Sequence, residues 1–170
     1  TGFYLRKFIE EEIGVIEDKN YTTPFPLFRL TEMYLNYAEA QYHLGNEALA
    51  REYINKVRDR EGVKMPHITD SGQDLLDKIY HERFIELAFE GHRFFDVRRW
   101  KIAEKTEICH IMGSKITKED DGTFSYERYK LTPDSRKTDW KDAFYRLPIN
   151  FSEIQKSNNS LTQNPGYELK

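Results

Sequence analysis

The sequence contains a single cysteine, Cys109, among its 170 residues. One cysteine excludes an intrachain disulfide and any zinc site built from several cysteines. Residues 1–7 lack the long apolar core of a signal peptide, and the first residue is not methionine. The formal net charge is only −3, and the basic residues form no stripe with interleaved aromatics. We therefore expect no nucleic-acid partner.

The residues that are present describe a folded globular chain. Charged residues make up 32% and aromatic residues 14%, a mixture too apolar for disorder and too polar for membrane spanning. The length suits one domain with a sizeable core. We expect a single mainly α-helical domain over residues 1–170, with helical hairpins over 27–103 and a loop-rich region with a few short strands over 104–170 packing on them.

Two helices are predicted between residues 27 and 62. Gly45 stands where a C-terminal cap would end the first helix, and the second runs from Glu47 until Gly62 closes it. The helically spaced positions are Leu27, Leu30, Tyr34, Tyr37, Ala38, Gln41 and Leu44, then Ala50, Tyr53, Ile54 and Val57. The tight turn predicts an antiparallel hairpin. The small residues at Ala38, Gly45 and Ala50 resemble the tetratricopeptide pattern, although an ordinary helical hairpin explains them equally well.

A third helix is predicted from Gln73 to Phe89, and a fourth element from His92 to Ala103. Gly91 would end or bend the chain between them, so a second hairpin could pivot there. The apolar face of the third helix would consist of Leu75, Leu76, Ile79, Tyr80, Phe84, Leu87 and Ala88.

The rest of the chain shows weaker patterns. Residues 1–26 should be extended up to Pro24 and Pro26, with a strand near 3–8. Residues 104–142 should be mostly loop, with one short strand near Phe124, Tyr126 and Tyr129. Residues 144–149 should form a buried extended segment, 151–155 a short helical turn, and 157–167 an irregular tail that turns at Pro165-Gly166.

The stretch from His81 to Trp100 concentrates charges and aromatics. Carboxylates near histidine could act as general acid and base, but His81-Glu82 is followed by Ile85 where a zinc motif needs a second histidine. Ion pairs are favoured over catalysis for Glu82, Glu86 and Glu90, with Arg83, Arg93, Arg98 or Arg99 as partners. The expected charge cluster is Glu82, Arg83, Glu86, Glu90, Arg93, Asp96, Arg98 and Arg99. Glu32 and Glu39 are also expected to pair with arginines of neighbouring helices. We expect no catalytic residue, no metal and no cofactor.

Sugar binding would require exposed aromatic rings beside amides or carboxylates, because a pyranose presents apolar C–H faces and a rim of hydroxyls. The candidates are Trp140 with Asp139, and Tyr126 with Tyr129, all within loop-rich sequence. Packing of these rings onto the helices is the competing interpretation, and it is the more common role of such residues.

Five motifs occur in a specific order: RLTEMYLNYAEA at 29–40, INKVRDREG at 54–62, ERFIELAFEGHRFFDVRRW at 82–100, YRLPI at 145–149 and LTQNPGY at 161–167. In this order they resemble the RagB/SusD family of Bacteroidetes nutrient-binding outer-membrane lipoproteins. The resemblance spans nearly the whole chain.

The resemblance implies tetratricopeptide-like hairpins in a lipid-anchored protein of the cell surface. Such proteins are not enzymes; they bind glycans or other nutrients and cover a SusC-like TonB-dependent transporter. Family members are several hundred residues long, so we expect this chain to be the C-terminal part, without the lipidated cysteine, which Cys109 cannot replace. The alternative hypothesis is a tetratricopeptide-like module that binds a protein and no nutrient.

Overall fold

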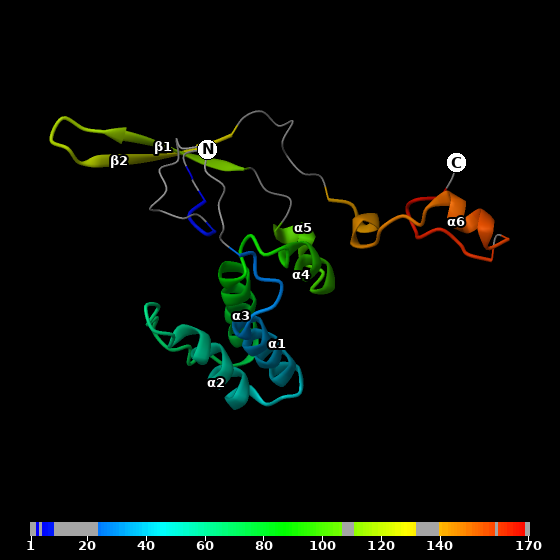
Figure 1. The fold of residues 1–170 in the computed structure, drawn as a ribbon, viewed down its shortest axis with the longest axis horizontal. Helices are drawn as coiled ribbons and strands as arrows, with labels where there is room; N and C mark the ends of the chain where they lie inside the picture. Colours follow the sequence, from blue (N-terminus) through cyan, green and yellow to red (C-terminus); the bar gives the residue numbers. More distant parts are fainter. Residues whose placement is uncertain are drawn as a thin grey trace. The chain divides into compact units, whose positions relative to one another are not determined.

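The computed structural model describes residues 3, 5–8, 24–106, 111–131, 140–158 and 160–168. The chain divides into two compact units. We call residues 5–94 the helical unit and residues 1–4 with 95–170 the C-terminal unit, and each is described by itself (Figure 1). The single domain expected over 1–170, divided at 103/104, stays a prediction.

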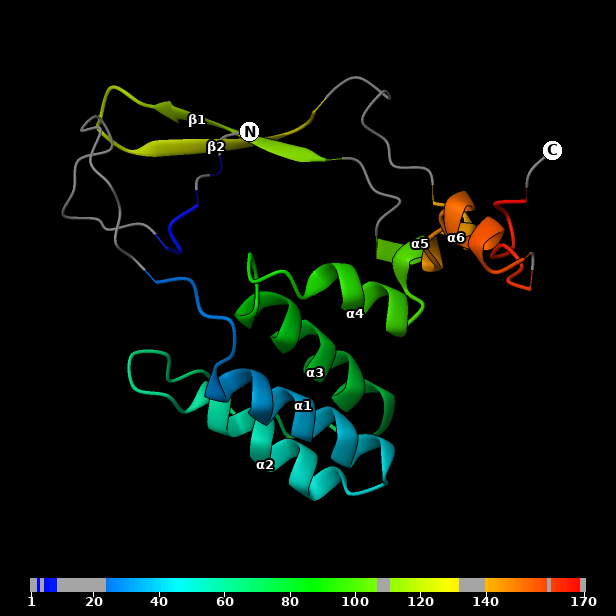
Figure 2. The ribbon, with the colours of Figure 1, turned by 45° about the vertical axis from the view of Figure 1, so that its right-hand side comes forward.

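The helical unit contains three long helices that lie side by side, α1 (Leu30–His43), α2 (Glu47–Arg58) and α3 (Gly72–Glu86) (Figure 2). The turn between α1 and α2 is tight because Gly45 adopts a φ of 83°, which costs a residue without a Cβ little. The amide of Asn46 donates to the carbonyl of Gln41 (2.8 Å) and that of Gly45 to Tyr42 (2.9 Å), the pairing that closes a helix end. The predicted hairpin and its cap are confirmed.

The core of the helical unit lies between these three helices. Ala38 on α1 and Ala50 on α2 are fully buried, and such small side chains let the two helices approach closely. The buried apolar residues of this core are Leu35, Ala38, Ala50, Ile54, Val57, Ile68, Leu75, Ile79 and Leu87. The predicted apolar positions of α2 at Ala50, Ile54 and Val57 are therefore confirmed.

The predicted face of α1 was correct only in part, because Ala38 is in the core and Tyr34 packs against it, but other positions differ. Leu30, expected in the core, is 63% exposed, whereas Leu35 is 0% exposed. Thr31, Glu32 and Glu39 are buried although they were not among the predicted apolar positions, and Leu27 and Leu44 are exposed. The buried side of α1 contains polar residues as well as apolar ones, and the hydroxyl of Thr31 accepts a hydrogen bond from Arg60, so hydrophobic spacing within the helix could not identify this side.

The chain from α3 onward departs from two predictions. Helix α3 ends at Glu86, three residues early, and Phe84 is exposed. The fourth element is two helices, α4 (Arg93–Arg99) and α5 (Ala103–Thr106), because Lys101 takes a left-handed φ of 53°. The amide of Ile102 then donates to Val97 (3.1 Å), which closes α4 as a glycine cap would. Gly91, with a φ of 84°, lies at the predicted corner.

The C-terminal unit contains a β-hairpin that was mostly missed. Strands β1 (Met112–Lys118) and β2 (Phe124–Lys130) pair antiparallel, with Ile116 opposite Tyr126. The strand expected near Phe124 is confirmed, but the loop expected over 104–142 is wrong where these strands run. Most residues of both strands are exposed, so β1 lacks the apolar alternation that marks a half-buried strand.

The end of the chain is held by side-chain amides. The amide of Gln163 both accepts from Ile149 N–H (2.7 Å) and donates to Ile149 C=O (2.7 Å), as a neighbouring strand would. Asn164 donates to the carbonyl of Leu147 (2.7 Å). The segment expected to be buried and extended instead begins with a 3-10 turn, η2 (Asp142–Tyr145), and Leu147 is exposed. Helix α6 (Phe151–Lys156) and the turn at 165–166 match the predictions.

Residues 5–8 show no strand in the part that the structure describes, because the chain turns at Lys7 and Phe8. No helix among the described residues is both long and apolar enough to cross a bilayer.

Candidate functional site

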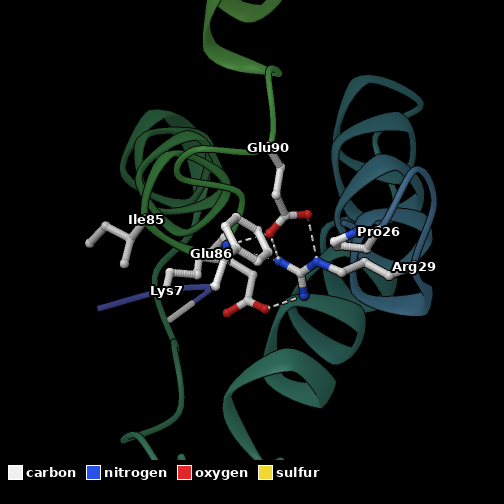
Figure 3. A pocket seen from close by; sticks show the side chains of 7 residues that line it. Lys7, Pro26, Arg29, Ile85, Glu86 and Glu90 are labelled. Carbon is white, nitrogen blue, oxygen red and sulfur yellow. Dashed lines mark hydrogen bonds and ion pairs between the residues drawn. The ribbon is translucent and has the colours of Figure 1, made fainter. Parts of the chain in front are cut away.

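The carboxylates singled out in the sequence meet at Arg29, which precedes α1. Its Nη1 donates to Glu86 Oε1 (2.5 Å), and its Nε and Nη2 donate to the two oxygens of Glu90 (2.7 and 2.8 Å). Arg60 binds the other oxygen of Glu86 (2.6 Å), and Lys7 binds Glu90 Oε1. Figure 3 shows Arg29 between the two glutamates. We call these five residues the Arg29 network.

The partners of the three glutamates differ from those predicted. Glu82 pairs with Arg58, and Glu86 and Glu90 pair with cations from Lys7, Arg29 and Arg60. Each cation comes from another segment, up to 83 residues away, rather than from the same stretch as the glutamates. The four-residue spacing of the glutamates therefore indicated that their side chains point in one direction. It did not identify the cations with which they pair.

The remaining members of the predicted cluster lie elsewhere. Buried Arg83 donates to Asn36 (2.6 Å) and lies 3.4 Å from His92 Nδ1. The guanidinium of Arg93 stacks on Phe84, 4.5 Å from the ring centre. In the C-terminal unit, buried Asp96 pairs with Arg99 (2.9 Å), and Arg98 stacks on Trp140.

Among the described residues, Glu32 pairs with no arginine, contrary to the prediction. Its buried Oε2 lies 3.8 Å from His92 Nε2 and has no hydrogen-bond partner among the described residues.

The Arg29 network is poorly suited to acid–base chemistry. All four carboxylate oxygens of Glu86 and Glu90 accept hydrogen bonds from cations, so neither group is available to move a proton. Burial alone would raise the pKa of Glu90, but its hydrogen bonds from Arg29 and Lys7 outweigh burial and hold the pKa below its usual value. The same bonds raise the pKa of Arg29 although burial opposes this. The Arg29 network is therefore a set of ion pairs that joins separate segments of the helical unit.

Acid should weaken the ion pairs of the Arg29 network. Because the pKa of Glu90 is lower in the folded chain than its ordinary 4.5, its contribution is complete above about pH 4.5 and is lost as pH falls through the folded-state pKa. We expect Glu90→Gln to lower the melting temperature at pH 7, and the gap from wild type to shrink as pH falls below about 4.5. Thermal melts of both proteins from pH 7 to pH 3 measure it. A gap that stays constant over this range would contradict the assignment.

Among the described residues, the helical unit contains several hollows, of which two lie beside the glutamates. One of about 430 Å³ borders the Arg29 network, with Ile85 and Pro26 among its walls. The other, about 550 Å³, lies between the 63–70 loop and α3 and is lined by Met65, His81 and Glu82, among others. Within the described residues, no three His, Cys, Asp or Glu side chains gather as a metal site would require.

The aromatic candidates for sugar binding occupy three different settings. Tyr126 on β2 is 70% exposed. Tyr129 lies on the opposite face of the hairpin, because strand side chains alternate, and its ring covers Gly113 so closely that a Cβ there would come within 2.6 Å of it. Trp140 is half-buried and packs edge-on against Phe144 and Tyr145. Asp139 lies outside the described residues.

Comparison with known proteins decides the family, since the family model of the SusD family matches residues 1–167. The chain belongs to the SusD family. Within the family it is similar to the SusD-like protein P25 of Formosa agariphila, with 42% identity over 102 residues that cover 58% of this chain and 19% of that protein. It is 28% identical over 156 residues to the starch-binding protein SusD of Bacteroides thetaiotaomicron, covering 86% of this chain and 22% of that protein.

Solved structures of SusD-like proteins share the fold. A SusD-like protein from Bacteroides fragilis superposes with a TM-score of 0.70 and 36% identity, over 84% of this chain and 26% of that one. The surface glycan-binding protein A from Bacteroides thetaiotaomicron gives 0.55 and 25%, over 86% and 26%. The mainly helical fold predicted from the sequence is confirmed. The chain spans about a fifth of the length of these curated SusD relatives.

Proposed function

We propose that this chain serves in glycan binding at the cell surface, as part of a SusD-like protein that delivers its ligand to a SusC-like TonB-dependent transporter. The names of two relatives, a starch-binding protein and a surface glycan-binding protein, support the ligand class. The observation within this chain that carries the proposal is the exposed ring of Tyr126, flanked by exposed Phe124 and Ile116. Aromatic rings offered to solvent on a rigid strand suit the C–H faces of sugars.

The location follows as part of the same proposal. A protein that loads an outer-membrane transporter must sit on the outer surface of that membrane, held by a lipid anchor. Its role is binding and transfer, so we propose no enzymatic step. The paired state of Glu86 and Glu90 agrees with this, since neither carboxylate is available as a general base.

The helical unit offers a surface for the transporter. Leu27, Phe28 and Leu30 are exposed next to one another at the start of α1, and exposed large apolar residues grouped in this way often mark contacts between proteins. We propose that this group faces the transporter while the hairpin faces the glycan.

Two experiments test the proposal. Titration of the protein against a panel of soluble polysaccharides and oligosaccharides should give saturable heat with at least one; no binding to any glycan would contradict glycan binding. Affinity purification from membranes of the source cell should recover a β-barrel transporter, and Phe28→Asp should reduce the yield. Equal recovery by wild type and variant would exclude this surface.

The second candidate is a tetratricopeptide-like interaction module without a nutrient ligand. The same exposed group at Leu27, Phe28 and Leu30 supports it, because it needs a protein partner but no sugar. This alternative would be favoured if a soluble partner were recovered in place of a transporter and if no glycan of the panel bound.

A further inference from the structure

The β-hairpin presents two chemically different faces. Strand alternation and the pairing register place Met112, Ser114, Ile116 and Lys118 of β1 beside Lys130, Arg128, Tyr126 and Phe124 of β2. We call this set the Tyr126 face. The opposite face contains Gly113, Lys115, Thr117, Ser125, Glu127 and Tyr129.

The centre of the Tyr126 face is an apolar row. Ile116 lies directly across from Tyr126, and Phe124 follows two residues along the same strand. All three side chains are exposed. The opposite face differs, because Tyr129 is folded down over Gly113 and leaves no comparable row of open rings.

The charges on the Tyr126 face are all positive. Arg128 lies beside Tyr126 on β2, and Lys118 lies opposite Phe124, so cations stand near both ends of the apolar row. Neither Lys118 nor Arg128 has an ion-pair partner among the described residues, and both are exposed. On the other face Lys115 is paired in register with Glu127.

Two of the three acidic residues of the connecting turn, Glu119 and Asp121, form hydrogen bonds with Ser125 and Thr123. Asp121 accepts from the amide and hydroxyl of Thr123 (2.9 and 2.6 Å), and the hydrogen bond from that side chain holds the pKa of Asp121 below its usual value. Glu119 accepts from the hydroxyl of Ser125, which belongs to the opposite face. Neither carboxylate neutralises Lys118 or Arg128.

We propose that the Tyr126 face binds an anionic glycan, one whose sugar rings carry carboxylate or sulfate groups. The proposal rests on the glycan binding proposed above and narrows its substrate class. Sugar rings lie on Tyr126 and Phe124, and their oxyanions reach Arg128 and Lys118. A guanidinium can bind a planar carboxylate or a sulfate through two N–H groups at once, which gives Arg128 the larger share of the selectivity. From residue 124 to 128 the strand extends about 14 Å, room for an oligosaccharide rather than a single sugar.

Matched polymer pairs test the charge requirement with the backbone held constant. Titration calorimetry compares dextran sulfate with dextran, and polygalacturonate with its methyl ester, so the two pairs also separate sulfate from carboxylate. We expect the charged member of at least one pair to bind about tenfold or more tightly than its neutral partner, because charge-assisted hydrogen bonds are added. Raising the salt concentration should reduce that difference.

Variants locate the site. Arg128→Ala with Lys118→Ala should weaken binding of the charged polymer about tenfold, whereas Lys115→Ala, a lysine of the same strand on the opposite face, should not. Tyr126→Ala should weaken binding of every glycan, and Tyr126→Phe should retain it, which separates loss of the ring from loss of the fold.

The outcomes are distinct. Equal binding of both members of each pair would overturn the anionic preference and leave glycan binding intact. Preference for the charged polymer that survives Arg128→Ala with Lys118→Ala, or that Lys115→Ala reduces as much, would overturn the Tyr126 face as the site. No binding of any of the four polymers would overturn the anionic preference, and no binding on the wider glycan panel as well would contradict the proposed function itself.

Discussion

Replacing Arg29 with alanine should lower the free energy of unfolding by about 3–5 kcal/mol, because it leaves Glu86 and Glu90 facing each other with fewer cations. The side chain of Glu90 is only 3% exposed, so water cannot replace the lost guanidinium. For a chain of this length the melting temperature should fall by roughly 10 °C. Thermal and denaturant unfolding measure the effect.

Arg29→Lys and Arg128→Ala are the matched variants for this experiment. Lysine keeps the charge but cannot reach both glutamates through a planar fork, so we expect an intermediate loss. Arg128 is an exposed strand arginine without an ion pair among the described residues, and its removal should change stability by no more than about 0.5 kcal/mol. Arg29→Ala and Arg128→Ala with equal stabilities would show that the Arg29 network does not hold the helical unit together.

Leu35→Ala should destabilise the chain by about 2–5 kcal/mol, since it removes a fully buried side chain between the three helices and leaves a cavity. Leu30→Ala, on the same helix but exposed, should cost less than about 0.5 kcal/mol. Urea denaturation of both variants, fitted with the same dependence of unfolding free energy on urea concentration, gives the two losses of stability. A larger loss for Leu30→Ala than for Leu35→Ala would support the face of α1 expected from hydrophobic spacing and contradict the observed one.

Local signals in the sequence predicted the elements of the helical unit well. Gly45 ends α1 as predicted, because it takes a left-handed φ that glycine adopts easily, whereas α2 ends at Arg58, before the end predicted at Gly62. Ala50, Ile54 and Val57 recur at helical spacing on the one face of α2 that is buried. Such features depend on residues a few positions apart, which a single sequence displays directly.

The errors arose where a residue depends on a distant partner. Glu32 and Glu39 are buried on α1 although their side chains are polar, so the spacing of apolar residues identified only part of the buried face. The cations around Glu90 come from Lys7 and Arg29, 83 and 61 residues earlier. Nothing within the stretch from His81 to Trp100 indicates which distant cations pair with Glu90. Lys101 interrupts the predicted fourth helix with a left-handed φ that glycine usually adopts. Because the residue is a lysine, the sequence did not indicate a break there.

The candidate site was predicted in part. Tyr126 and Tyr129 were selected together as exposed rings, but a strand places residues three apart on opposite faces, and only the pairing register shows that Ile116, Arg128 and Lys118 accompany Tyr126. The sequence of β1 has no strong strand signal, so these neighbours could not be found without the structure.

The most direct test of the Tyr126 face as a glycan-binding surface is a glycan array probed with the wild-type chain and with Tyr126→Ala side by side. We expect the wild type to bind a subset of glycans enriched in carboxylate- or sulfate-bearing chains, and the variant to lose that signal while it melts at the wild-type temperature. Signals of equal strength from both proteins would contradict the claim that the hairpin is the binding surface.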